Sequence, residues 1–365
     1  MESRRRTISY DVLKAFAIFL VCFYHFNHLG LGFIPGEKYY PSIIYIFFGL
    51  ASMGVPLFFM VNGALLLNKP FNFINHIQKS IRLYFIVVIW KFITVTILIW
   101  KNQLTDYTWV NFANLLFSNS FPNVDLAVYW FMNALISIYL IFPIIKEIFD
   151  RSNLLTYYLT GIIFFFATGL DTLGYLLKVI QWFTGTESLA LADLKSMNPF
   201  GNYAYALFYF LLGGILGKWL SQSKNVPSTW VSILVFSIGW ILLTLWGTYN
   251  TNNNNQLFDT VFNGYPTIMT VTMSLGIFVL FYRLNVELKF LRETVIFISR
   301  NTLSVYFLHW IVGYILSEYY FKLFVNHLEL AVFAVFTHSL FLLSTSLVLS
   351  SIIQRIPLLN KLVKM

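Results

Sequence analysis

Charged residues are scarce in this chain of 365 residues, of which 11% are Asp, Glu, Lys or Arg. A soluble globular domain carries about 25%. Hydrophobic residues make up 58% and aromatic residues 19%, and the mean hydropathy is +0.71. Such a composition over this length does not fit a core buried in a water-soluble protein. The sequence therefore predicts a polytopic integral membrane protein.

Cysteine and the common metal-binding motifs are missing or nearly so. Cys22 is the single cysteine, so a disulfide within the chain is excluded and cysteine usage is uninformative about the redox compartment. The sequence has no HExxH, no Cys/His cluster, no GxGxxG after a predicted strand and no GxSxG. We therefore expect no bound metal.

Long apolar runs fill most of the chain. A membrane-spanning helix needs about 20 mostly apolar residues, and the segments that meet this criterion lie near residues 9–30, 43–67, 81–100, 127–149, 154–170, 203–220, 229–248, 264–283, 301–317 and 330–353. The stretch LKFLRETVIFISRN before the ninth segment fits an amphipathic cytoplasmic piece. Gly213 and Gly217 in FLLGGILGK have the spacing of closely packed helices. Because no soluble domain or repeat interrupts the segments, residues 1–365 are predicted to form one all-α bundle with about ten transmembrane helices.

The chain has a net charge of +9, and its Lys and Arg residues are distributed unequally between the two sides of the predicted membrane bundle. If the N-terminus is cytoplasmic, seventeen Lys and Arg residues lie on that side, and the five on the opposite side are Lys38, Lys101, Lys178, Lys195 and Lys322. The positive-inside rule then places both termini in the cytoplasm. Nucleic acid is not an expected partner, because the cations are spread between apolar segments and not clustered on a soluble surface.

Lys14 and His25 are polar residues of the first predicted span, DVLKAFAIFLVCFYHF at 11–26. They are 11 residues apart, about 16 Å along a helix and within about 20° of the same face. Either Lys14 extends to the headgroups and His25 hydrogen-bonds a neighbouring helix, or both are functional, because histidine is the usual proton-transfer group near neutral pH. A cation at the membrane edge and a base deeper in the bundle suit a long ligand with phosphates at one end, such as an acyl-coenzyme A (acyl-CoA).

Two more cations lie where the third predicted span, INHIQKSIRLYFIVVIWK, enters the membrane. Lys79 and Arg82 are three residues apart and share one helical face. They are either ordinary positive-inside flanking residues or, together with Lys14, the mouth of a phosphate-binding site.

Three other polar side chains are candidates for contacts with a ligand or with the base. Lys91 lies about 13 Å beyond Arg82, and since no span has an acidic residue in its middle, a cavity, a polar partner or a ligand must face it. His309, in SRNTLSVYFLHWIV, is predicted near mid-membrane as a structural or a functional histidine. Asp11 lies one turn before Lys14, where an ion pair would also orient that lysine.

In these residues the sequence resembles the membrane acyltransferase-3 family, bacterial integral-membrane O-acyltransferases that modify surface polysaccharides. The resemblance covers essentially the whole chain. The family's first-helix pattern, a basic residue, ten residues and a histidine, is matched by Lys14 and His25, and its basic-x-x-Arg pair by Lys79 and Arg82. MGVPLFFMVNGALLL resembles the Phe-Phe-x-x-Ser-Gly segment, with Asn62 where serine is usual. YWFMNALISIYLIFPII and LSVYFLHWIV resemble segments of the fourth and penultimate helices.

The resemblance implies transfer of an acyl group, most often acetyl, from cytoplasmic acyl-CoA to a hydroxyl of a cell-surface or lipid-linked glycan at the bacterial cytoplasmic membrane. It implies that His25 is the catalytic base and that Lys14, Lys79 and Arg82 bind acyl-CoA, a co-substrate and not a bound cofactor. The remaining candidates for substrate contact or for support of the base are Asp11, Asn62, Lys91 and His309.

A transporter of a glycan or of a proton-coupled solute is the main alternative, because intramembrane histidines also serve in proton relays. The lack of a buried Asp or Glu and of repeat symmetry argues against it. A structural membrane scaffold is the third interpretation, in which the alignment of Lys14 and His25 is accidental.

Overall fold

The structure, a computed structural model, describes residues 7–27, 29–101, 107–122, 124–185, 192–223, 225–284, 286–357 and 359–362. Several cations of the predicted cytoplasmic side lie outside these ranges, namely Arg4, Arg5, Arg6, Lys224 and Lys364. The helices are α1 (Ile8–Tyr24), α2 (Ile43–Ala51), α3 (Gly54–Leu67), α4 (Phe73–Trp100), α5 (Trp109–Asn114), α6 (Trp130–Arg151), α7 (Asn153–Phe164), α8 (Leu170–Thr184), α9 (Ala192–Ser196), α10 (Ala204–Gln222), α11 (Thr229–Asn254), α12 (Ile268–Tyr282), α13 (Lys289–Arg300), α14 (Thr302–Lys322) and α15 (Ala331–Arg355). β1 (Ser120–Phe121) and β2 (Val124–Asp125) form a short antiparallel pair. The prediction of an all-α fold is confirmed.

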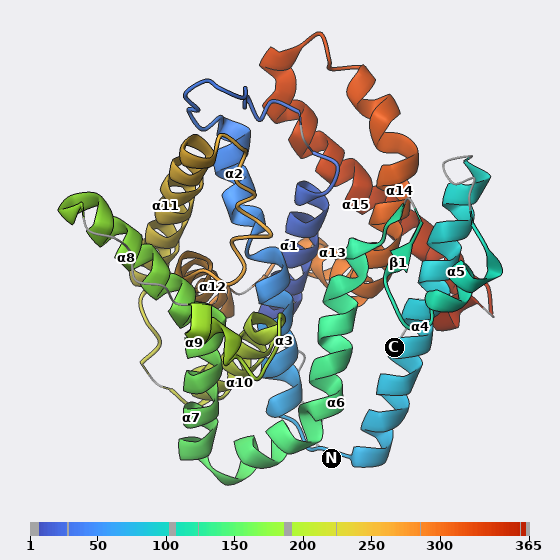
Figure 1. Ribbon diagram of the computed structural model, residues 1–365. Coiled ribbons are helices and arrows are strands. Elements are labelled where there is room, and N and C mark those ends of the chain that lie inside the picture. The colour runs from blue at the N-terminus through green and yellow to red at the C-terminus, as the bar shows by residue number, and fades with distance from the viewer. Residues whose placement is uncertain are drawn as a thin grey trace.

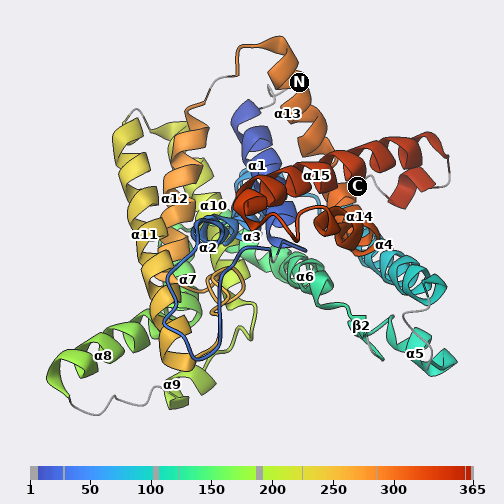
Figure 2. The ribbon, with the colours of Figure 1, turned by 90° about the horizontal axis from the view of Figure 1, so that it is seen from above.

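Most long helices run roughly in one direction through the bundle, while α8 leans out on one side and α5 lies on the opposite side (Figure 1). A π-helical segment, Phe165–Gly169, joins α7 to α8. Seen from above, α1 lies near the middle of the bundle (Figure 2). It contacts α2, α3, α12, α13, α14 and α15, and Leu13, Ala17, Ile18 and Cys22 are fully buried. The first helix is therefore enclosed by protein on several sides.

Seven helical segments of the described chain are long and apolar enough to cross a membrane, and eight are if α13 and α14 count as one bent span. The seven are Ile43–Leu67, Phe73–Trp100, Ala127–Arg151, Asn153–Gln181, Ala204–Gln222, Thr229–Asn254 and Leu328–Arg355. α1 and α12 are shorter, with 17 and 15 residues. Each of the ten predicted segments contains a helix, as expected for a multi-pass membrane protein.

The end of the first predicted span differs from the sequence prediction, whereas the break before the ninth span is as predicted. α1 ends at Tyr24 and not near residue 30, because His25 has an extended backbone and Phe26 is left-handed with φ 64°. The Asn27 side chain then donates to the Phe23 carbonyl oxygen at 2.7 Å, which closes the turn. α13 is a separate helix that meets α14 at a bend of 73°, as the interrupted pattern before the ninth segment indicates.

Glycine allows α3 and α10 to pack backbone against backbone. A Cβ atom at Gly213 would lie 2.0 Å from the Met60 carbonyl oxygen, and one at Gly63 would lie 1.8 Å from the Phe210 carbonyl oxygen. Gly217 faces Ala64 in the same interface. The prediction of close helix packing from the spacing of Gly213 and Gly217 is confirmed.

Candidate active site

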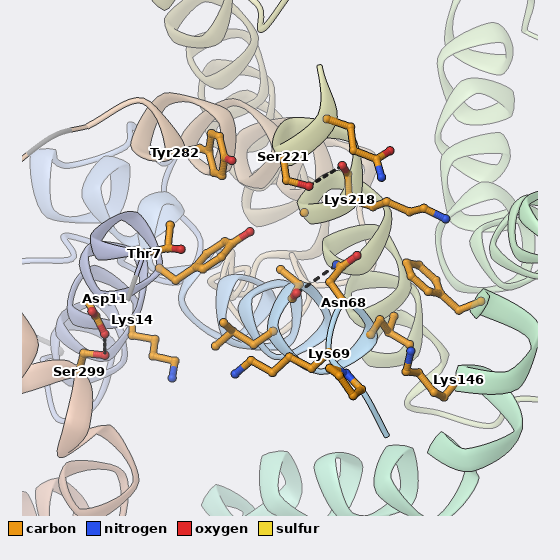
Figure 3. Close-up of a pocket in the computed structure, with 18 of the residues that line it drawn as sticks. Thr7, Asp11, Lys14, Asn68, Lys69, Lys146, Lys218, Ser221, Tyr282 and Ser299 are labelled. Atoms are coloured by element: carbon orange, nitrogen blue, oxygen red, sulfur yellow. Dashed lines mark hydrogen bonds between the residues drawn. The ribbon is translucent and has the colours of Figure 1, made fainter. Parts of the chain in front are cut away.

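A cavity of about 1200 Å³, here called the basic cavity, opens where α1 begins and where α3, α6 and α10 end. Figure 3 shows Lys14 and Lys69 extending toward the same part of it. The cations that line it are Lys14, Lys69, Lys146, Lys218 and Arg300, and the carboxylates are Asp11 and Asp150. Because positive charges outnumber negative ones, the basic cavity favours an anionic ligand.

Neighbouring side chains bind two of these lysines. The Lys146 ammonium contacts both carboxylate oxygens of Asp150 at 2.5 Å, and Lys218 Nζ donates to Asn153 Oδ1 at 3.0 Å. Within the described ranges, Lys69 Nζ has neither a hydrogen-bond acceptor nor an ion-pair partner. The ammonium of Lys69 is therefore available to an anion in the cavity.

Asp11 connects α1 to the end of α13. Its side chain is buried and accepts a hydrogen bond from Ser299 Oγ at 2.6 Å (Figure 3). The expectation that no Asp or Glu is buried is therefore wrong for Asp11. Lys14 follows one turn later and lines the same cavity. The contact with Ser299 thus fixes the turn of α1 that carries Lys14 against the helix at the cavity wall.

Lys79 and Arg82 do not line the basic cavity, although the sequence predicts that they lie beside Lys14. Both are exposed near the start of α4, and Arg82 Nη2 donates to the carbonyl oxygen of Lys361 at 3.3 Å. α4 packs against α6 and α14, and α14 also contacts α1. Lys14 therefore lines the basic cavity without Lys79 and Arg82.

His25 lies directly after the last residue of α1, at the end of the helix opposite Lys14. Its Nδ1 is 2.8 Å from the Val21 carbonyl oxygen. A carbonyl oxygen only accepts, so Nδ1 carries the proton and Nε2 of the neutral ring is left as the basic nitrogen. His25 lines a small cavity of about 40 Å³ together with Tyr24 and Tyr306. This small cavity is called the central cavity below.

His309 is the neighbour of His25 in the core. The two ring centroids are 5.0 Å apart in an edge-to-face arrangement, and His309 is fully buried. Its Nδ1 is 3.0 Å from the Val305 carbonyl oxygen, while its Nε2 has no hydrogen-bond partner among the residues that the structure describes. The sequence places both histidines at mid-membrane depth, and the structure brings their rings into contact.

Lys91 and Asn62 lie away from both cavities. Lys91 is buried, and its Nζ donates to the carbonyl oxygens of Ser118 at 3.1 Å and of Leu115 at 3.4 Å. It therefore has the polar partner that its depth requires, on the segment that follows α5. Asn62 Nδ2 donates to the Phe58 carbonyl oxygen of its own helix at 2.9 Å.

The sequence reasoning missed most of the cations that line the basic cavity. Lys69, Lys146, Lys218 and Arg300 were assigned only to membrane topology. The signal that they share is their position on the predicted cytoplasmic side of four different spans, and only the packing of those span ends brings them to one cavity.

Comparison with known proteins identifies the family of the chain. The family described as "Acyltransferase domain", Acyl_transf_3, matches residues 7–355, nearly the whole chain. Comparison with curated proteins and with solved structures finds no match. Because the family match covers nearly the whole chain, including α1 and the helices that enclose it, the chain belongs to the acyltransferase-3 family of membrane acyltransferases.

Proposed function

We propose that this membrane acyltransferase transfers an acyl group, in the first instance acetyl, from cytoplasmic acyl-CoA to a hydroxyl of a cell-surface or lipid-linked glycan. The observation that carries the proposal is the placement of two sites at opposite ends of α1. Lys14 lines the basic cavity at one end, and His25 stands with a basic Nε2 at the other. The rise of α1 separates them by about 16 Å.

The basic cavity supports the binding of the donor phosphates. Its volume of about 1200 Å³ exceeds the roughly 300–1,000 Å³ that hold a drug-sized ligand. Charge-assisted hydrogen bonds to phosphate are strong, and Lys14 and Lys69 are the cations that we assign to this role. Lys79 and Arg82 carry the family's basic pair, and we propose that they contact the donor on the same side of the bundle.

His25 is proposed as the general base. Its Nε2 takes the proton from the sugar hydroxyl while the hydroxyl oxygen attacks the carbonyl carbon of the thioester. The carbon–sulfur bond then breaks, and the leaving thiolate receives the proton from His25. The products are an O-acylated glycan and the free thiol of CoA. His309, in ring contact with His25, is proposed to hold the imidazole in place.

We further propose ten spans in the bacterial cytoplasmic membrane, with both termini cytoplasmic. The distribution of Lys and Arg along the sequence supports this topology. α1 and α12 are about 26 Å and 22 Å long, shorter than a hydrocarbon core of about 30 Å. Short helices are tolerated here because neighbouring helices of the bundle contact both of them.

The test measures transfer of label from radioactive acetyl-CoA to cell-envelope glycan in membranes that contain the protein. We expect alkali-labile label on the glycan, lowered at least about 100-fold in His25→Ala, the range for loss of a general base. His327→Ala is the matched control, because His327 is exposed in the loop before α15. Equal label from His25→Ala and the wild type would remove His25 as the base. Solute flux without consumption of acetyl-CoA would support a transporter instead.

A further inference from the structure

A second large cavity, of about 870 Å³, lies at the other end of the bundle. It is formed by α8, the start of α10, the end of α11 and residues 256–266. α10 begins at this outer cavity and ends at the basic cavity, so the length of that helix, about 28 Å, separates the two. The outer cavity is therefore distinct from the proposed donor site.

The outer cavity combines side-chain amides with aromatic rings. Asn202, Asn254, Gln256 and Asn263 line it, and their side chains make no hydrogen bond within the ranges that the structure describes. Phe262, another lining residue, is 55% exposed. An amide offers both donors and an acceptor to a hydroxyl group, and the negative face of an aromatic ring attracts C–H groups. Together they suit a sugar ring.

The carboxylates of the outer cavity are already occupied. Asp171 is paired with Lys195 at 2.6 Å. Asp259 accepts a hydrogen bond from the Tyr24 hydroxyl at 2.5 Å and another from the backbone N–H of Val261 at 2.8 Å. Lys178, which is exposed on α8, also lines the cavity, and together with Lys195 it balances the charges of Asp171 and Asp259. The cavity therefore carries no net charge and its remaining polar groups are mainly neutral amides, which favours an uncharged saccharide.

Two contacts connect the outer cavity to His25. Tyr24, which binds Asp259 of the outer cavity, is the residue directly before His25. Phe262 lines both the outer cavity and the central cavity that contains His25, and its ring meets Trp130 edge to face at 6.3 Å. Phe262 therefore lies between the outer cavity, whose lining suits a sugar ring, and His25, whose Nε2 is the proposed base.

We infer that the outer cavity binds the acceptor, an uncharged saccharide that stacks on Phe262, hydrogen-bonds to Asn254 and its neighbouring amides, and directs one hydroxyl toward His25. This inference rests on the proposed acyl transfer, since it names the acceptor site of that reaction. Phe262 and Asn254 would then determine which saccharide is accepted, and Tyr24 would position His25 relative to the ligand through Asp259.

The experiment measures binding of the purified, detergent-solubilised protein to an array of neutral and acidic saccharides, without any acyl donor. We expect the wild type to bind neutral saccharides on the array. Asn254→Ala and Phe262→Leu should bind them at least about tenfold more weakly. Phe262→Leu keeps an apolar side chain but removes the ring face. Asn253→Ala is the matched control, because Asn253 is exposed on the same helix and does not line the cavity.

The outcomes separate this inference from the proposed function. Binding that Asn254→Ala and Phe262→Leu both weaken, and Asn253→Ala does not, supports the acceptor site even if no acyl transfer is found. A wild type that binds no neutral saccharide, or that binds it as well as both variants do, overturns the inference, even if label transfer depends on His25. In kinetic assays the same two variants should raise the acceptor KM and leave the acetyl-CoA KM unchanged.

Discussion

The interface between α3 and α10 allows a quantitative test of the fold. In Gly213→Ala the new Cβ atom would lie 2.0 Å from the Met60 carbonyl oxygen and 2.3 Å from its Cα atom, whereas ordinary contact begins at 3.4 Å. Both neighbours are backbone atoms, so no side-chain rotation relieves the clash and the helices must separate by more than 1 Å. Overpacking of this kind costs about 1–3 kcal/mol, and we expect a value near the upper end.

The assay is reversible unfolding by SDS titration in mixed micelles, which reports the change in free energy of unfolding. Gly161→Ala is the control, because a Cβ atom at that position of α7 would meet nothing within 4 Å. Alanine is the better helix former, so this variant should be neutral or more stable by up to about 1 kcal/mol. Equal effects of the two substitutions, or no loss of stability in Gly213→Ala, would refute the packing described here.

Three further predictions concern the site. Lys14→Ala and Lys69→Ala should each raise the acetyl-CoA KM about tenfold, a loss of roughly 1.4 kcal/mol, with the acceptor KM unchanged; initial rates at varied acetyl-CoA test this, and an unchanged donor KM contradicts it. His309→Ala should lower kcat and change the KM of the donor and of the acceptor less, because the ring that contacts His25 is lost. A change confined to KM would argue against a positioning role. Lys91→Met should lower the free energy of unfolding by about 1–3 kcal/mol through the loss of hydrogen bonds from a charged donor, as SDS titration would show; no change would mean that Lys91 is dispensable for the segment after α5.

Much of the fold follows from the sequence because a membrane-spanning helix needs about 20 consecutive, mostly apolar residues. Apolar runs of the required length predict a helix in each of ten places, and the spacing of Gly213 and Gly217 predicts close packing. The end of α1 at Tyr24 was not predictable from hydropathy, since a left-handed residue such as Phe26 leaves no apolar signal. α1 and α12 have 17 and 15 residues and are therefore too short to be counted among the helices that could cross a membrane by their own length.

The candidate site was only partly predictable, and for a different reason. Lys14 and His25 share one short helix, so their separation follows from helix geometry alone. The contact of His25 with His309 and the gathering of Lys69 beside Lys14 depend on which helices are neighbours, which the sequence pattern does not encode. The same holds for Arg82, which does not line the basic cavity although its helix, like α1, contacts α14.

The central claim is that donor and acceptor reach His25 from opposite ends of α1. The most direct test reconstitutes the protein in vesicles in one orientation, with acetyl-CoA confined to one side and the acceptor saccharide to the other. We predict acylated saccharide when acetyl-CoA is on the side of Lys14 and the saccharide is on the side of Asn254, and none in the reverse arrangement. Transfer that occurs only when both substrates share one side would contradict the account.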